Sequence, residues 1–63
     1  MMITEVKAFK DWTNDQLEAY ELINEKINKY ASEKNAVIKD IKYQEYYFAG
    51  VTYVLANAIF EHN

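Results

Sequence analysis

Residues 51–60 constrain the fold most, because this segment is apolar on both sides of an extended chain. Its alternating residues form two faces, one with Val54, Ala56, Ala58 and Phe60, the other with Tyr53, Leu55 and Ile59. Asn57 is the single polar interruption between Tyr53 and Phe60. Such a pattern is typical of a central strand that is covered on both sides. We therefore predict a strand that buries one face in its own domain and the other against another molecule.

The chain is short for a self-sufficient core. A domain of 63 residues buries only about 60% of the surface that its unfolded chain exposes. Disulfides, a metal or oligomerisation usually compensate. The chain has no cysteine, and His62 is its only histidine, so we expect no disulfide, no metal and no cofactor. Self-association remains, and we predict a homodimer or another small closed oligomer.

Composition indicates an ordered protein that is not embedded in a membrane. Hydrophobic residues make up 51% of the chain, there is no proline, and the net charge is −3. The apolar runs are far shorter than a membrane span. The first nine residues lack the basic start and long apolar centre of a signal peptide. We expect one domain over residues 1–63, located in the cytoplasm, or in the host cytoplasm if the protein is phage-encoded.

Residues 14–33 show the spacing of a helix with one wide apolar side. That side comprises Leu17, Ala19, Tyr20, Ile23, Ile27, Tyr30 and Ala31. Thr13 and Gln16 have the spacing of a capping box, and Trp12 with Leu17 that of a hydrophobic staple. Leu22 falls on the polar side, and Asn35 is a suitable left-handed terminator.

Two further segments read as strands, residues 2–10 and 36–43. In the first, Thr4, Val6 and Ala8 alternate against Ile3, Glu5, Lys7 and Phe9; in the second, Val37, Ile41 and Tyr43 alternate against Ile38, Asp40 and Lys42. We predict a connection over residues 44–51; the alternative is that the strands continue to a tight turn at Ala49 and Gly50.

The order strand, helix, strand, strand predicts an α+β fold. The third strand lies between the first and second and is antiparallel to both, which gives a three-stranded antiparallel sheet of order 1-3-2, half of a ferredoxin-like domain. One helix covers one face, and the other face forms an oligomer interface. The alanines at 56 and 58 are expected under the helix.

The pattern resembles the short sporulation-associated proteins of spore-forming Firmicutes and their phages. The resemblance rests on hydrophobic spacing in residues 2–9, 17–24, 37–43 and 56–61. It implies no catalytic motif. It does imply a mobile-element or sporulating-host setting, in which unexplained small proteins bind other proteins.

No residue pattern predicts catalysis, and we expect the protein not to be an enzyme. Glu61 and His62 are adjacent, but the end of a chain is usually loose and catalysis needs held geometry. No glycine-rich phosphate loop is present. Ser32 and Thr52 could act as nucleophiles only with a general base, and we expect no histidine to serve as that base.

We therefore predict a non-enzymatic protein-binding module that pairs with itself and with an unidentified host protein, for example as a phage inhibitor of a host defence protein. The residues expected at the oligomer interface are Tyr43, Tyr53, Leu55, Asn57 and Ile59. The candidates for partner binding are Tyr46, Tyr47, Phe48, Leu22, Asp15, Glu18 and Glu25.

Two alternatives stay open. The aromatic segment from Tyr43 to Tyr53 could stack single-stranded nucleic acid, although a net charge of −3 and the absence of arginine disfavour it. The other alternative is a structural protein of the spore or virion. The acidic residues of the helix either dock on a basic partner or form a solvated face that follows the helix dipole.

Overall fold

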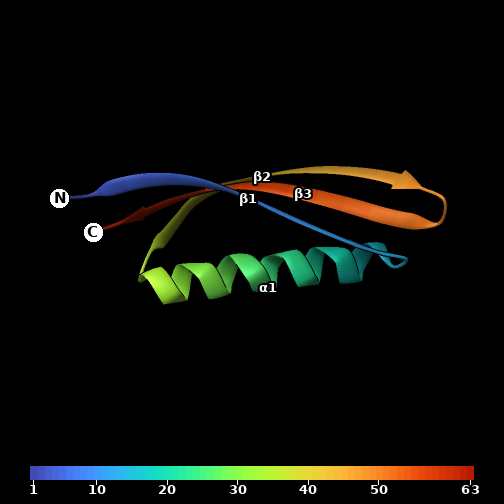
Figure 1. The fold of residues 1–63 in the computed structure, drawn as a ribbon, viewed down its shortest axis with the longest axis horizontal. Coiled ribbons are helices and arrows are strands. Elements are labelled where there is room, and N and C mark those ends of the chain that lie inside the picture. The colour runs from blue at the N-terminus through green and yellow to red at the C-terminus, as the bar shows by residue number, and fades with distance from the viewer.

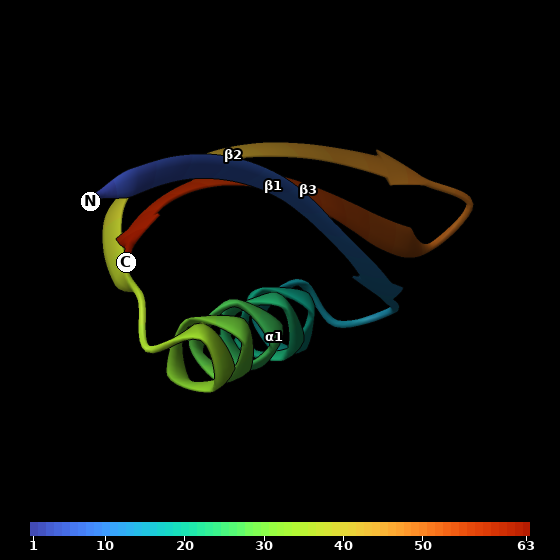
Figure 2. The same ribbon diagram turned by 60° about the vertical axis from the view of Figure 1, so that its left-hand side comes forward.

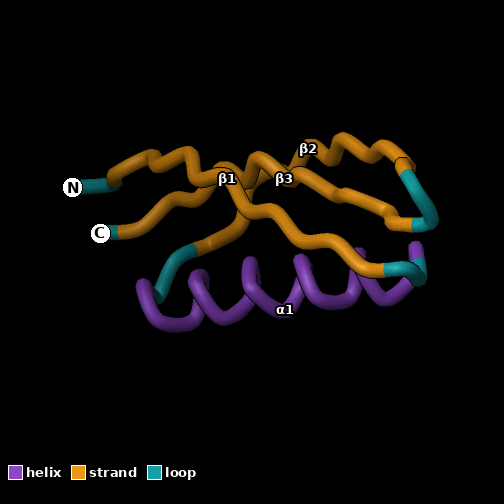
Figure 3. Tube along the Cα trace, turned by 45° about the vertical axis from the view of Figure 1, so that its right-hand side comes forward, coloured by secondary structure: helices purple, strands orange, loops and turns teal.

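The computed structural model describes residues 1–63 as four elements joined by short connections (Figures 1 and 3). They are strand β1 (Ile3–Thr13), helix α1 (Gln16–Lys34), strand β2 (Val37–Phe48) and strand β3 (Val51–His62). The strands form one antiparallel sheet in the order β1-β3-β2. The helix lies along one side of the sheet, which arches over it (Figure 2). The predicted α+β fold and strand order are confirmed.

Asp15, rather than Thr13, caps the start of α1. Its Oδ1 accepts the backbone N–H groups of Leu17 at 3.0 Å and Glu18 at 3.3 Å, which satisfies two donors that the first turn leaves free. Thr13 is the last residue of β1, so the predicted capping box is wrong. The staple is wrong too, because Trp12 belongs to β1 and Leu17 is 68% exposed. The correct signal was Asp15 followed three residues later by Glu18.

Asn35 ends α1 in the left-handed conformation that the sequence predicted, with a φ of 52°. Its backbone N–H donates to the carbonyl oxygens of Ala31 and Ser32, two of the acceptors that a helix end leaves free. The chain can then turn directly into β2.

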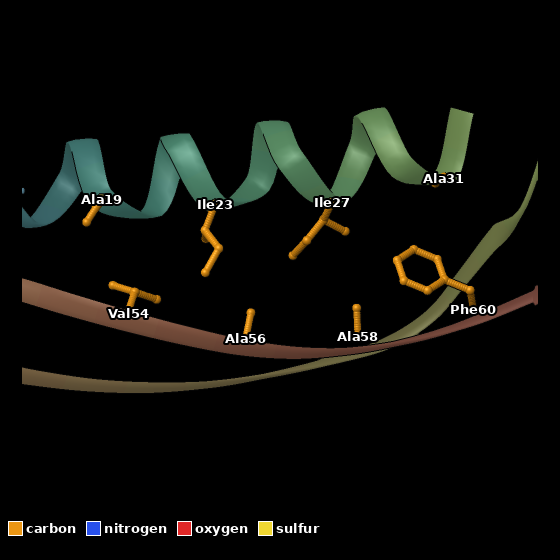
Figure 4. Packing of buried hydrophobic residues seen from close by; sticks show 8 residues of the cluster. All are labelled: Ala19, Ile23, Ile27, Ala31, Val54, Ala56, Ala58 and Phe60. Atoms are coloured by element: carbon orange, nitrogen blue, oxygen red, sulfur yellow. The ribbon is translucent and has the colours of Figure 1, made fainter. Parts of the chain in front are cut away.

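The core is a single layer between α1 and the helix-facing side of β3 (Figure 4). Its eight buried apolar residues are Ala19, Ile23, Ile27, Ala31, Val54, Ala56, Ala58 and Phe60. Ala56 and Ala58 are completely buried opposite Ile23 and Ile27. Small side chains on the strand let the helix approach closely, and the larger isoleucines fill the space between the layers. The predicted helix-facing side of β3 is confirmed.

A β-bulge in β2 changes which side chains face α1. The pairing register shifts between Ile38 and Asp40, so Lys39 is an extra residue in this strand. As a result Ile38 and Ile41 both lie on the helix side and pack against the core, whereas Val37 lies on the opposite side and is exposed. The predicted grouping of Val37 with Ile41 is wrong, because regular alternation takes no account of a bulge.

The strands β2 and β3 run on to a two-residue turn at Ala49 and Gly50 (Figure 3). The connection predicted over residues 44–51 is therefore wrong, and the tight-turn alternative is correct. Both turn residues have positive φ, 53° for Ala49 and 78° for Gly50, as hairpin turns of this length require. An L-residue such as alanine is disfavoured there by about 1–2 kcal/mol.

Replacing Ala49 by asparagine should stabilise the hairpin. Asparagine tolerates the left-handed region better than alanine, so we expect Ala49→Asn to raise the free energy of unfolding in urea by about 0.5–1 kcal/mol. Gly50→Ala is the matched opposite change. Nothing lies within 4 Å of a Cβ added at Gly50, so its expected loss of about 1 kcal/mol would come from backbone strain alone. A less stable Ala49→Asn variant would contradict this account of the turn.

Candidate functional site

The side of the sheet that faces away from α1 is the candidate site, and we call it the outer face. By register it comprises Thr4, Val6, Ala8, Lys10 and Trp12 of β1, Val37, Asp40, Lys42, Gln44, Tyr46 and Phe48 of β2, and Val51, Tyr53, Leu55, Asn57, Ile59 and Glu61 of β3. No other element of the chain lies on it (Figures 1 and 2). Large apolar side chains there are left in water, and Val6, Trp12, Tyr46 and Phe48 are each more than half exposed.

Three aromatic rings form a row across the outer face. Trp12 pairs with Tyr53, and Tyr53 pairs with Tyr46, so one ring comes from each strand. The ring centroids are 6.5 Å apart for Trp12 and Tyr53 and 4.9 Å apart for Tyr53 and Tyr46, with interplanar angles of 28° and 12°. Each stacked pair contributes about 0.5–1.5 kcal/mol beyond its area burial. Tyr53 has a neighbouring ring on each side, so neither of its faces is free to stack on a base.

A shallow groove of about 630 Å³ borders this aromatic row. Its lining residues are Lys10, Asp11, Trp12, Gln44, Glu45, Tyr46, Tyr53, Val54 and Leu55. The two acids point to the other side of the sheet, where Asp11 lies 3.0 Å from Lys26 Nζ and Glu45 accepts hydrogen bonds from α1. Lys10 is therefore the charged side chain that the groove presents, and it has no ion-pair partner within the chain.

Four of the five residues predicted at an interface share the outer face, and Tyr43 does not. Tyr53, Leu55, Asn57 and Ile59 alternate along β3 on this side. Tyr43 lies on the helix side, where its hydroxyl donates to Asn24 Oδ1 at 2.6 Å. Its ring meets that of Tyr20 edge-on at 5.5 Å. Tyr43 pairs with Ala56 of β3 and so shares the helix side with Ile41, a placement set by the register between the two strands.

The aromatic segment around the hairpin is divided between the two faces. Tyr46 and Phe48 lie on the outer face, whereas Tyr47, with Tyr43, lies on the helix side. Tyr47 is 69% exposed, since α1 does not reach this end of β2. The segment therefore does not form one continuous stacking platform.

The predicted partner-binding residues of α1 have different surroundings. Asp15 is engaged as the helix cap, and Glu18 and Glu25 are exposed to solvent. Leu22, expected to be the exposed leucine, is half-buried, whereas Leu17, expected in the core, is exposed. Helical spacing located the apolar side of α1, but not which margin of that side the rest of the fold covers.

Hydrogen bonds join the end of α1 to the paired ends of β1 and β3. The Tyr30 hydroxyl donates to Glu5 Oε2 at 2.6 Å, and His62 Nε2 lies 3.2 Å from Glu5 Oε1. The hydrogen bond from Tyr30, with a smaller contribution from His62, lowers the pKa of the Glu5 carboxyl, and the same bond raises the pKa of Tyr30. His62 belongs to β3, and its side chain is only 16% exposed. The expectation of a loose end at Glu61 and His62 is thus wrong.

A second polar cluster fastens the start of α1 to β2. Glu45 accepts hydrogen bonds from Tyr20 Oη and from Gln16 Nε2, both at 2.6 Å. The bond from Tyr20 is the main reason that the pKa of this tyrosine is raised. These acids satisfy donors of the chain itself, and no group of three or more potential ligands is arranged to hold a metal ion. The only helix, α1, is not apolar enough to cross a membrane.

Comparison with protein-family models, with curated proteins and with solved structures finds no match for this chain. The resemblance to sporulation-associated proteins stays a prediction, and function has to be inferred from the outer face.

Removing the Tyr30 hydroxyl should raise the pKa of Glu5. We expect Tyr30→Phe to shift the Glu5 titration, followed by carboxyl NMR shifts, upward toward its usual value of 4.5. A lowered folded pKa stabilises the fold above the unfolded pKa, and that stabilisation is lost as the pH falls through the folded value. The native protein should therefore lose more stability below about pH 4.5 than the variant does.

Tyr20→Phe is the control, because it removes an equally short hydrogen bond to a different acid, Glu45. It should leave the titration of Glu5 unchanged. Equal Glu5 pKa values in the native protein and in Tyr30→Phe would contradict the assigned cause.

Proposed function

We propose that this chain is a non-enzymatic protein-binding module that works as a homodimer, with the outer face of each sheet covered by a second copy. The proposal rests on the contrast between a core built from small side chains and an outer face that exposes large apolar ones. Four of the eight core residues are alanines. Six large apolar residues of the outer face are exposed, namely Val6, Trp12, Val37, Tyr46, Phe48 and Leu55. Exposed apolar surface of this extent is typical of an interface.

The outer face is large enough for a stable dimer. A standard interface buries about 800 Å² per partner, which is roughly a sixth of the 4591 Å² of accessible surface of this chain. The face is three strands wide, and an 11-residue strand such as β1 is about 36 Å long. Burying one leucine- or valine-sized side chain contributes about 1.5–3 kcal/mol. Pairing would thus add stability to a domain whose core has only eight buried apolar residues.

The strand edges are less suited to pairing than the outer face. On β1, Asp11 Oδ1 accepts the backbone N–H of Trp12 at 2.9 Å, and Lys26 Nζ donates to the Lys10 carbonyl oxygen at 3.2 Å. On β2, Asp40 Oδ1 accepts the N–H of Ile41 at 2.9 Å, next to the bulge. Occupied backbone groups and bulges are ways in which edge strands avoid pairing with another chain.

Packing sheet against sheet would leave α1 of each copy on the outside of the dimer. Glu18, Glu21 and Glu25 of the helix are exposed there, and this acidic side is suited to a basic surface of a further protein partner. The division of the tyrosines between two faces and the net charge of −3 favour a protein partner over nucleic acid. The inhibitory role toward a host protein stays a prediction.

Leu55→Asp should separate the two copies. Leu55 lies at the centre of the outer face and outside the core, so the fold of each copy should survive. A charge buried without a partner costs about 3–5 kcal/mol. We therefore expect native protein to sediment at twice 7.5 kDa at micromolar concentration, and Leu55→Asp to sediment as a folded monomer with an unchanged circular dichroism spectrum.

Leu17→Asp is the matched control, because it makes the same chemical change at an exposed leucine on α1. It should stay dimeric. Trp12, the only tryptophan, lies on the outer face, so dilution of the native protein below its dissociation constant should shift the fluorescence to the red. A native monomer, or a dimeric Leu55→Asp variant, would contradict the proposal; open-ended assembly would favour the structural-protein alternative.

A further inference from the structure

The charges on the outer face restrict how a second copy can lie on it. This inference rests on the proposed dimer and specifies its geometry. Four charged residues belong to the face by register: Lys10, Asp40, Lys42 and Glu61. Glu61 is already paired, with Lys39 Nζ at 3.6 Å, whereas the other three have no ion-pair partner within the chain. An unpaired charge buried in a dimer is costly, so a stable arrangement has to bring opposite charges together.

The register groups the outer face into rows that run across the three strands. The row of Ile59 contains Val6 and Asp40, and the row of Asn57 contains Ala8 and Lys42. Asp40 and Lys42 are therefore neighbours along β2, one row apart.

The next row on each side of this pair also holds a charged residue. The row of Leu55 contains Lys10, and the row of Glu61 contains Thr4. These rows are placed symmetrically, one on each side of the pair formed by the Asn57 and Ile59 rows.

In a symmetric face-to-face dimer whose two sheets pack with their strands aligned, the two-fold axis lies between the sheets and runs either along the strands or across them. An axis along the strands would lay β1 of one copy over β2 of the other. Asp40 would then face Val6, and Lys42 would face Ala8, so both charges would be buried against apolar groups. This arrangement is disfavoured.

An axis across the strands lays each strand over its own copy, and its position decides which charges meet. An axis that passes through the Asn57 row would place Lys42 of one copy over Lys42 of the other. An axis through the Ile59 row would do the same for Asp40, and an axis through the Leu55 row would do the same for Lys10. Each of these positions brings like charges together.

We propose that the two-fold axis of the dimer crosses the strands between the Asn57 and Ile59 rows, so that Asp40 of each copy pairs with Lys42 of the other. Of these arrangements, this one gives both residues an opposite charge. It also brings Lys10 of one copy to the row that holds Glu61 of the other. Asn57 of each copy then lies over Ile59 of the other, next to the axis.

The same geometry gives the groove an occupant. The row of Trp12 lies over the chain just before Ile3 of the second copy, where Met2 is exposed. A methionine thioether beside aromatic rings is a favourable contact. The groove beside the aromatic row would be closed by the start of the second copy.

A charge exchange tests this register. In Asp40→Lys both copies would carry two lysines at the contact, and in Lys42→Asp both would carry two aspartates. We expect each variant alone to dimerise at least about tenfold more weakly than the native chain. The double variant with both changes should dimerise within about threefold of the native chain, because the opposite charges face each other again.

Mixing the two single variants gives the sharpest result. In a mixed dimer each lysine of one copy faces an aspartate of the other, so the mixture should form heterodimers while each variant alone stays largely monomeric. Native mass spectrometry separates the species by mass. Glu25→Lys on the exposed side of α1 is the control and should leave dimerisation unchanged.

The outcomes separate the register from the dimer itself. Single variants that dimerise as the native chain does, or a mixture without heterodimers, would overturn the register and leave the proposed dimer intact. A native chain that stays monomeric would overturn both. Circular dichroism of each variant tests whether it is folded. This control matters most for Asp40→Lys, because Asp40 also accepts a hydrogen bond from the Ile41 N–H.

Discussion

The close approach of α1 to β3 is the contact on which the rest of the structure depends. Ala56 and Ala58 are completely buried beneath Ile23 and Ile27, and half of the core residues are alanines. Small side chains bring the helix close to the sheet, but they contribute little apolar area themselves. Polar contacts on both flanks then hold the helix in place, through Glu5 near its end and Glu45 near its start. The small side chains thus explain both the close packing of α1 on β3 and the limited apolar area that the core buries.

Because the core is small, much of the apolar surface of the domain lies on the outer face. One helix can cover only one side of a sheet, and none of the four elements lies on the other side (Figure 2). The aromatic row of Trp12, Tyr53 and Tyr46 orders part of that face without covering it. A second copy would supply the missing layer and give a helix–sheet–sheet–helix arrangement, in keeping with the rule that domains bury their sheets between layers. The exposed acids of α1 would then be the surface left for other proteins.

The sequence predicted the position of a site residue correctly only where that position depends on the alternation within a single strand. The two faces of β3 could be predicted because this strand alternates regularly along its whole length. Tyr43 was misplaced because its side of the sheet depends on its pairing with Ala56 of β3, which alternation within β2 does not reveal. Leu17 and Leu22 exchanged roles, since spacing defines the apolar side of a helix but not which margin the sheet covers. His62 could not be placed, because its partner Glu5 is 57 residues away in sequence.

The sequence by itself determined the element order, the strand order and the central strand with two apolar faces, because these follow from periodicity, chain length and the handedness of connections. The sequence also indicated the left-handed residue that ends α1, Asn35, and offered Ala49 and Gly50 as the residues of a tight turn. Only the tertiary structure decided which residue caps α1, where β2 bulges, and which charges share the outer face. Those features depend on the register between strands distant in sequence, and register is fixed when the helix and sheet pack together.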